Sequence, residues 1–299
     1  MTDLAQPTLD DRRAGLIAAA AAYLIWGFLP VYFKLVGFAD AREILGMRIL
    51  WSVPAALVAV AFTAGGFAQL RPAFQPKMLL TLAASALFIF CNWGIYVYAV
   101  TSERVMEAAL AYFLAPLVNV GMGVAFFSEK LSRAQLAALV LAALGVIAQG
   151  VAMGAAPILP IALCATWSLY ALIRKQAPVS SAAGLFVETC WLIVPSAALI
   201  FWTAQTARVA FDDSAGQALL LAISGPLTAI PLMLFAIGAR RLTFSALGLL
   251  QYIAPSIQFL LGLLYGEPFT ALRGVSFALI WAGLLFFSWD AVRKERALR

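Results

Sequence analysis

Long apolar runs separated by short polar turns fill nearly the whole chain. A helix needs about 20 apolar residues to span the hydrocarbon core of a bilayer, and the runs here are of about that length. Helices are expected because a bilayer offers no water to a free backbone amide or carbonyl group. The pattern predicts ten membrane-spanning helices, near residues 14–36, 43–63, 77–100, 105–127, 133–151, 156–173, 182–203, 217–238, 242–264 and 270–289.

The sparse polar, aromatic and proline residues repeat between the two halves of the chain. At an offset of 141, Trp26, Lys34 and Pro54 coincide with Trp167, Lys175 and Pro195. At an offset of 139, Asn92, Tyr112, Pro116, Asn119 and Gly123 coincide with Pro231, Gln251, Pro255, Gln258 and Gly262. We therefore predict two five-helix repeats, residues 1–151 and 152–299. Because five is odd, the second repeat would be inverted, with the substrate path between the repeats near the membrane midplane.

Composition and charge place the chain in the bilayer and orient it there. Hydrophobic residues make up 64% of the sequence and charged residues 11%, which excludes a soluble protein. With a cytoplasmic N-terminus, cytoplasmic segments would carry fourteen of the 20 Lys and Arg residues, so both termini are predicted to be cytoplasmic. These residues lie at 12–13, 71, 77, 130, 133, 174–175, 240–241 and 293–299. Because they occupy alternate loops, the net charge of +6 does not indicate a nucleic-acid surface.

Several kinds of chemistry are missing from the sequence. It has no histidine to relay a proton or bind a metal, and no GxxxxGK phosphate loop, so we expect no direct use of ATP and no implied ATPase partner. Cys91, Cys164 and Cys190 lie in apolar runs without metal-ligand spacing. Residues 1–13 carry acids and a proline, so no removable signal peptide is expected. We expect neither a metal nor a cofactor.

Two proline-containing stripes mark candidate cavity walls. They consist of Tyr112, Pro116 and Asn119 in the fourth predicted helix and Gln251, Pro255 and Gln258 in the ninth. A proline removes a backbone hydrogen bond, and a bilayer tolerates the freed carbonyl only beside a neighbouring group or cavity water. The stripes therefore indicate a wet inner face, although Asn119 and Gln258 would also serve simply to join helices.

Aromatic residues supply further candidate walls. They and their neighbours are Trp26 and Pro30 in the first predicted helix, Asn92, Trp93 and Tyr96 in the third, Trp167 and Tyr170 in the sixth, and Tyr252 in the ninth. Flat, slightly polar surfaces suit organic solutes of amino-acid size, cations included, better than bare inorganic ions.

Only Arg48 and Glu188 are charged residues well inside apolar runs, where such residues are expensive and usually functional. Both lie about two turns from the start of a predicted helix, so each is expected to reach back toward its own membrane face. Each is a candidate gate or substrate contact, and an equal candidate for a structural anchor. Their repeat positions place them toward opposite membrane sides, so a direct pair is not expected. Glu43 lies in a first helical turn, where the helix dipole favours an acid, and is expected to be structural.

These residues belong to a set of short motifs that resembles the drug/metabolite transporter superfamily, specifically the EamA-type proteins of the RarD group. The motifs include Trp26–Gly27, Tyr32–Lys34, Asn92–Trp93, YFLAPLVN at 112–119, QYIAP at 251–255 and YGE at 265–267. The resemblance implies ten helices in two inverted units, a cavity between helices 1–4 and 6–9, and efflux of small metabolites, amino acids among them, or of drug-like compounds across the bacterial inner membrane. RarD-like chains often carry His-Arg where this chain has Met47–Arg48, so a coupling scheme based on that histidine does not carry over.

The sequence favours an exporter of small metabolites, most of all amino acids, that works by alternating access through an aromatic-lined cavity. A passive facilitator or channel would share these features. A membrane-embedded enzyme is disfavoured, because paired intramembrane carboxylates are missing. The expected partners are a small-molecule substrate and the lipid bilayer. We also expect that no dedicated protonatable carboxylate drives transport.

Overall fold

The computed structural model describes residues 9–101, 105–153 and 158–265, with scattered positions between 271 and 289. Within these residues it is helical and contains no strand. Its helices are α1 (Leu9–Leu35), α2 (Ala41–Phe62), α3 (Leu70–Ala73), α4 (Pro76–Thr101), α5 (Val105–Phe127), α6 (Arg133–Met153), α7 (Ile158–Gln176), α8 (Ser181–Trp191), α9 (Ile193–Thr206), α10 (Ala215–Arg241), α11 (Phe244–Leu250) and α12 (Ile253–Leu264). Two short 3₁₀ turns, Gly66–Gln69 and Ala210–Asp212, lie in the connections.

The helices are those of a polytopic membrane protein. In the described part of the chain, six segments are long and apolar enough to cross a bilayer, or seven if the bent pair α8–α9 counts as one span. The six lie in α1, α2, α4, α7, α10 and residues 244–261, and shorter apolar stretches lie in α5 and α6. The count of ten stays a prediction, because the expected helix at 270–289 falls largely outside the described residues.

Two predicted continuous helices are broken, and a proline accounts for each break. The expected helix at 242–264 divides at Gln251–Tyr252, four and three residues before Pro255. Proline has no N–H for the carbonyl four residues earlier, which here is that of Gln251. The expected helix at 182–203 divides at Leu192, three residues before Pro195, and α8 and α9 meet at 47°. Continuity was therefore a wrong expectation for both.

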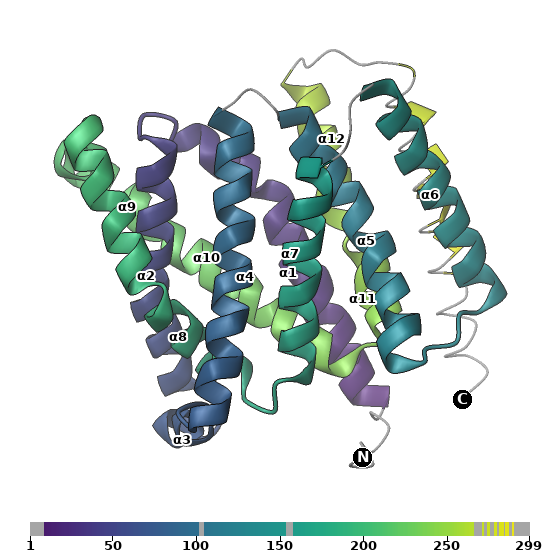
Figure 1. The fold of residues 1–299 in the computed structure, drawn as a ribbon, viewed down its shortest axis with the longest axis horizontal. Coiled ribbons are helices and arrows are strands. Elements are labelled where there is room, and N and C mark those ends of the chain that lie inside the picture. Colours follow the sequence, from purple (N-terminus) through teal and green to yellow (C-terminus); the bar gives the residue numbers. More distant parts are fainter. Residues whose placement is uncertain are drawn as a thin grey trace.

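The order of directions supports the predicted inversion. In Figure 1 the chain ascends through α1, descends through α2, ascends through α4, descends through α5 and ascends through α6. It then descends through α7, ascends through α8–α9, descends through α10 and ascends through α11–α12. An inverted second repeat requires this reversed order, and the repeat itself stays a prediction.

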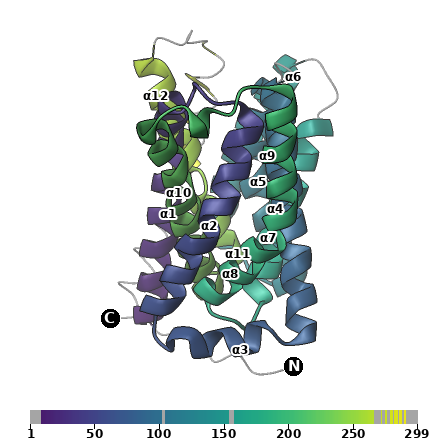
Figure 2. The same ribbon diagram turned by 90° about the vertical axis from the view of Figure 1, so that its left-hand side faces the viewer.

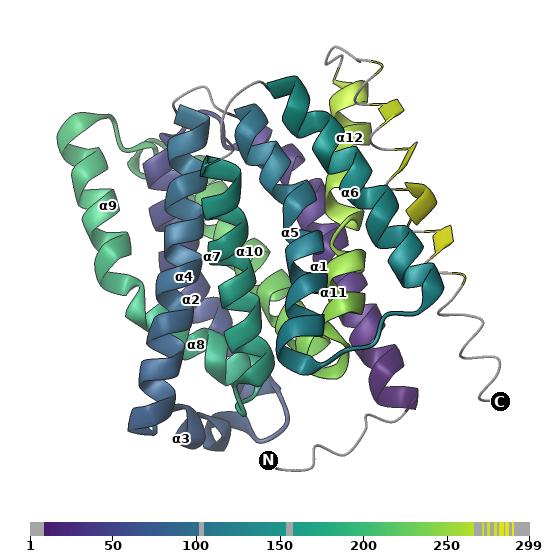
Figure 3. The same cartoon turned by 45° about the vertical axis from the view of Figure 1, so that its right-hand side comes forward.

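The helices enclose a central region between two groups. Seen from the side in Figure 2, α1, α10 and α12 lie on one side and α4, α5 and α7 on the other. Figure 3 shows α9 and α6 at opposite ends of the long axis, away from the centre. Close approach of backbones fixes some of these contacts: a Cβ on Gly225 of α10 would collide with the backbone of Trp51 in α2. The central helices therefore surround whatever lies between the two groups.

Candidate substrate cavity

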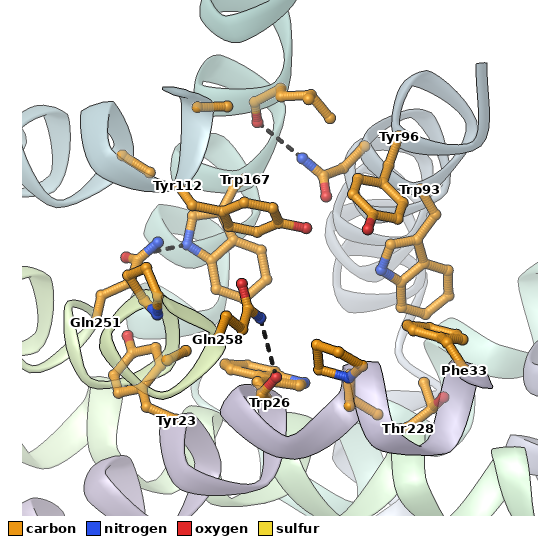
Figure 4. A pocket seen from close by; sticks show the side chains of 18 of the residues that line it. Tyr23, Trp26, Phe33, Trp93, Tyr96, Tyr112, Trp167, Thr228, Gln251 and Gln258 are labelled. Carbon is orange, nitrogen blue, oxygen red and sulfur yellow. Dashed lines mark hydrogen bonds between the residues drawn. The ribbon is translucent and has the colours of Figure 1, made fainter. Parts of the chain in front are cut away.

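A cavity of about 440 Å³ lies between the two groups of helices, within the range usual for small-molecule sites. α1, α2, α4, α5, α7, α10 and the α11–α12 region all contribute to its wall (Figure 4). The predicted site residues that line it are Trp26, Pro30, Arg48, Asn92, Trp93, Tyr96, Tyr112, Trp167, Gln251, Pro255 and Gln258. The structure thus brings together, from both halves of the chain, most of the residues chosen from the sequence.

Packed aromatic rings form one wall of the cavity. The rings of Trp26 and Trp167, which occupy equivalent repeat positions, meet edge to face with centroids 5.3 Å apart. Phe235 supports both from behind, at 5.9 and 5.1 Å. The hydroxyl of Tyr23 donates to the carbonyl of Leu247 at 3.3 Å and ties α1 to α11. This wall is rigid, because each ring is held by others.

Two glutamine amides of the cavity wall are held by hydrogen bonds. Pro30 leaves the carbonyl of Trp26, four residues earlier, without its helical donor. The side-chain amide of Gln258 donates to that carbonyl at 3.2 Å (Figure 4). On the opposite side, the Gln251 side-chain oxygen at the helix break accepts from the Trp167 indole at 3.3 Å. The Gln258 amide is thus held by a carbonyl that a proline has freed, and the Gln251 amide by a neighbouring side chain.

Asn92 fastens the α4 wall to α7. Its side-chain amide donates to the carbonyl of Leu163 at 2.8 Å and to the hydroxyl of Thr166 at 3.0 Å. The amide nitrogen is therefore engaged in joining helices, while the side chain still lines the cavity.

Arg48, from α2, places a charged side chain in the cavity wall. Its Nε donates to the hydroxyl of Thr228 at 3.0 Å, and that hydroxyl in turn donates to the carbonyl of Ser224 at 2.8 Å. The guanidinium carbon lies 5.1 Å from the ring centroid of Trp93 and 5.5 Å from that of Phe33. No ion pair of Arg48 occurs with the residues that the structure describes. It points inward, so the expected reach toward a membrane face is wrong for this residue.

Five predicted site residues do not line the cavity. Tyr170 stacks on Phe235 behind the wall, with centroids 6.1 Å apart, because the next turn of α7 lies in the packed core. The Tyr252 hydroxyl donates to the carbonyl of Phe113, between α12 and α5, at 3.0 Å. Asn119 is buried and donates to the side-chain oxygen of Gln251 at 3.0 Å, so it supports a wall residue from behind.

Pro116 is the fourth of these residues, and it faces α11. A Cβ on Gly248 would lie 2.8 Å from the Pro116 carbonyl oxygen, so the glycine permits the close approach of the two helices. The stripe on α5 is therefore divided: Tyr112 reaches the cavity, while Pro116 and Asn119 pack against the second half of the chain.

Glu188 lies away from the cavity and does not reach a membrane face. Its side chain is 2% exposed and forms an ion pair at 3.4 Å with Arg174, which is equally buried. Arg174 was expected in a cytoplasmic loop, but α7 continues to Gln176 and carries it into the core. Because two buried charges compensate each other here, Glu188 is better described as part of a structural pair than as a gate. Glu43 is structural as expected: it accepts from the amides of Ala210 and Phe211 at 3.0 and 2.9 Å.

Several lining residues were missed from the sequence, among them Tyr23, Phe33, Lys34, Cys164 and Thr228. Phe33 and Thr228 have no signal of their own, since each acts through its contact with Arg48. Lys34 did have a signal, because it repeats as Lys175.

The repeated lysines lie in different surroundings at the two ends of the cavity. Lys34 is exposed, lines the cavity, and has its Nζ 3.1 Å from the ring centroid of Tyr265. Lys175 donates to the carbonyls of Ala239 and Leu242 at the end of α10, at 3.0 and 2.5 Å. We call the first region, Lys34 with Tyr265, the open end.

The region around Lys175 is sealed, and we call it the closed end. Beside Lys175, Glu129 accepts from the amides of Phe244 and Ser245 at 2.5 and 2.9 Å and so caps the first turn of α11. Phe244 is fully buried against Phe127, with ring centroids 5.8 Å apart. The closed end is defined by Phe127, Glu129, Lys175 and Phe244, and it joins α5, α7, α10 and α11.

A bundle of apolar helices around a polar and aromatic cavity, open at one end and sealed at the other, is the architecture of a membrane transporter. The model of the EamA-like transporter family matches residues 13–149. An uncharacterized transporter of Vibrio cholerae is 36% identical over 98% of both chains. Protein RarD of Escherichia coli is 37% identical over 95% of this chain and 97% of its own.

The chain belongs to the EamA-like transporter family and is a RarD-like permease. A more distant relative, 27% identical over 94% of this chain, is the chloramphenicol-sensitive protein RarD of Pseudomonas aeruginosa. A solved crystal structure superimposes with a TM-score of 0.71 at 21% identity, over 92% of this chain and 97% of the other, which shows that the fold is shared.

Proposed function

We propose that the protein exports small organic metabolites, amino acids above all, across the bacterial inner membrane by alternating access of the central cavity. The observation that carries the proposal is the cavity itself: it has the size of a small organic solute, is walled by aromatic rings and amides from both halves of the chain, and is sealed at one end. The matching transporter family and the relatives named as transporters support the same class of function.

The two ends support alternation over a permanent channel. A channel needs a continuous path, whereas Phe244 at the closed end and Leu247 on the next turn of α11 are fully buried. The closed end is also held by polar contacts that can be exchanged, because Lys175 and Glu129 bind the ends of α10 and α11 and not a continuous core. Opening it requires these helix ends to move.

The distribution of basic residues supports a direction. Arg174, Lys175, Arg240 and Arg241 lie near the closed end, where α7 and α10 finish in Figure 1. Cytoplasmic ends of membrane helices carry an excess of Lys and Arg, so the closed end would face the cytoplasm. The structure would then represent the outward-facing state, with its cavity reached from the periplasm.

An untargeted comparison of metabolites released by overexpressing and deletion cells would identify candidate solutes. Purified protein in proteoliposomes should then move the same solutes, with and without a proton gradient. We expect saturable flux that Trp26→Ala and Trp167→Ala reduce at equal protein incorporation, because these rings form the wall. Flux that both variants leave unchanged would place the route elsewhere, and linear flux without saturation would favour a channel.

A further inference from the structure

We propose that Arg48 is the carboxylate-binding subsite of the cavity, and that the solute is an organic carboxylate or a zwitterion with an apolar or aromatic body. This inference rests on the proposed function, since it concerns what the transport cavity recognises. It is carried by the position of one guanidinium group among aromatic rings.

The charge balance of the cavity favours an anionic group. Among the described lining residues there are two cations, Arg48 and Lys34, and no carboxylate. Arg48 lies partly buried on α2, where an unpaired charge is costly. A solute carboxylate would supply the missing counter-charge, whereas an amine without a carboxylate would add a third positive charge to the same cavity.

The geometry of Arg48 favours a planar, two-point partner. Its Nε is committed to Thr228, whose own hydroxyl proton is committed to Ser224, so the side chain is fixed in direction. Within the described part of the chain, the hydrogen bond of the Arg48 side chain is that of its Nε, which leaves the two terminal nitrogens for a solute. A guanidinium group held in this way presents a fork that matches both oxygens of a carboxylate.

The surroundings of Arg48 suit a compact molecule whose other end is apolar. Trp93 and Phe33 cover the guanidinium group. Figure 4 shows the hydroxyl-bearing rings of Tyr96 and Tyr112 on the same cavity as Trp93 and Phe33. Across the cavity lie Trp26 and Trp167, which offer ring faces and edges but no charge. The carboxylate would thus lie at α2 and the body of the solute against the tryptophan wall.

Matched aromatic probes test this inference on the full purified chain. We would measure binding of phenylacetate against phenylacetamide, and of L-phenylalanine against 2-phenylethylamine, by quenching of tryptophan fluorescence. The wild type should bind the carboxylate of each pair about ten times more tightly or better, as expected for a charge-assisted hydrogen-bonded contact. Arg48→Gln should bring each ratio close to one. Arg42→Gln, on the same helix but outside the cavity, should leave both ratios unchanged.

The conservative variant Arg48→Lys should give an intermediate ratio, because it keeps the charge and loses the fork, and it supplies the test if Arg48→Gln does not fold. Equal binding of carboxylate and amine by the wild type would overturn the subsite. So would a ratio that survives both Arg48 variants. No binding of any probe together with no solute flux would instead count against the proposed function, and the subsite would fall with it.

Discussion

The two ends of the cavity each carry a lysine beside an aromatic ring, but the surroundings of the two lysines differ. At the closed end, Lys175 binds the last carbonyls of α10 and lies 5.1 Å from the Phe127 ring. At the open end, the equivalent Lys34 lies 3.1 Å from the ring of Tyr265 and lines the cavity. Phe127 and Tyr265 begin the similar tripeptides Phe-Ser-Glu and Tyr-Gly-Glu. The two ends therefore differ in that Lys175 binds helix-terminal carbonyls as well as facing a ring, whereas Lys34 is exposed beside its ring.

The comparison teaches how a duplicated chain can alternate. If the repeats are related by inversion, a latch that closes one end has a counterpart that can close the other. The difference between the ends is then a difference of state and not of sequence.

The largest expected effect concerns the buried ion pair near the closed end. Arg174–Glu188, near the closed end, is buried, so Glu188→Leu should destabilise the protein by about 3–5 kcal/mol because it leaves an uncompensated buried charge. The double variant Arg174→Met/Glu188→Leu should recover most of the loss. The stability of the single and the double variant is measured by thermal unfolding in detergent, with size-exclusion chromatography as the readout of folded protein. A single variant as stable as the wild type would show that the pair does not hold this region.

The next effect tests the latch. Lys175→Met should favour opening of the closed end by about 1.5–3 kcal/mol, the usual worth of hydrogen bonds to a charged group. With Cys91, Cys164 and Cys190 replaced by serine, a cysteine at the buried Ser245 should therefore react with a thiol reagent at least about tenfold faster. Lys34→Met is the matched control and should not raise that rate. Equal rates in the three proteins would remove the distinction between the lysines.

A smaller effect distinguishes lining residues from supporting ones. Gln258 lines the cavity and Asn119 lies behind it, so Gln258→Leu should reduce flux more than Asn119→Leu. Both should fold, because hydrogen bonds within membranes average only about 0.6 kcal/mol. Proteoliposome uptake at equal incorporation decides the order. The reverse order of effects would indicate that Asn119 faces the solute in another state.

The smallest effect is at the surface of the open end. Asp40 caps α2, and its hydrogen bonds to Arg42 lower the pKa of the Asp40 carboxyl below its usual value. A lowered folded-state pKa contributes stability above the unfolded value, which is lost as the pH falls through the folded value. Asp40→Asn should therefore cost only about 0.3 kcal/mol at neutral pH, and less in acid, since the pair is partly exposed. Unfolding midpoints of the two proteins at neutral and acid pH provide the measurement; a cost that grows in acid would contradict the assignment.

The sequence predicted helix positions well because apolar length alone defines them in a bilayer. α5 spans the predicted residues 105–127, and α1, α2 and α4 agree within a few residues except where α1 begins early at Leu9. The interruptions at Leu192 and Gln251 were missed, since a proline acts on backbone several residues earlier and helices such as α2, with Pro54, absorb it without breaking.

The cavity was predictable where a residue was unusual for a bilayer, as with Arg48, Gln251 and Gln258. It was not predictable where a partner decides the role. Arg174 looked like a loop residue because it follows the apolar run of its helix. Its counter-charge, Glu188, lies on the next helix, and only the folded structure brings the two side chains together. Tyr170 lies one turn after Trp167 on the same helix face, yet its ring stacks on Phe235 and is buried in the core.

The central claim is that solute passes through the cavity only when the closed end opens. The most direct measurement is flux of the best-transported solute through a cysteine-free background in which Phe127→Cys and Phe244→Cys are joined by a short thiol-reactive cross-linker. Cross-linking should stop nearly all flux, and cleavage of a reducible linker should restore it, while each single-cysteine variant stays active. Full flux in the cross-linked protein would contradict the account, because the solute would then cross without opening this end.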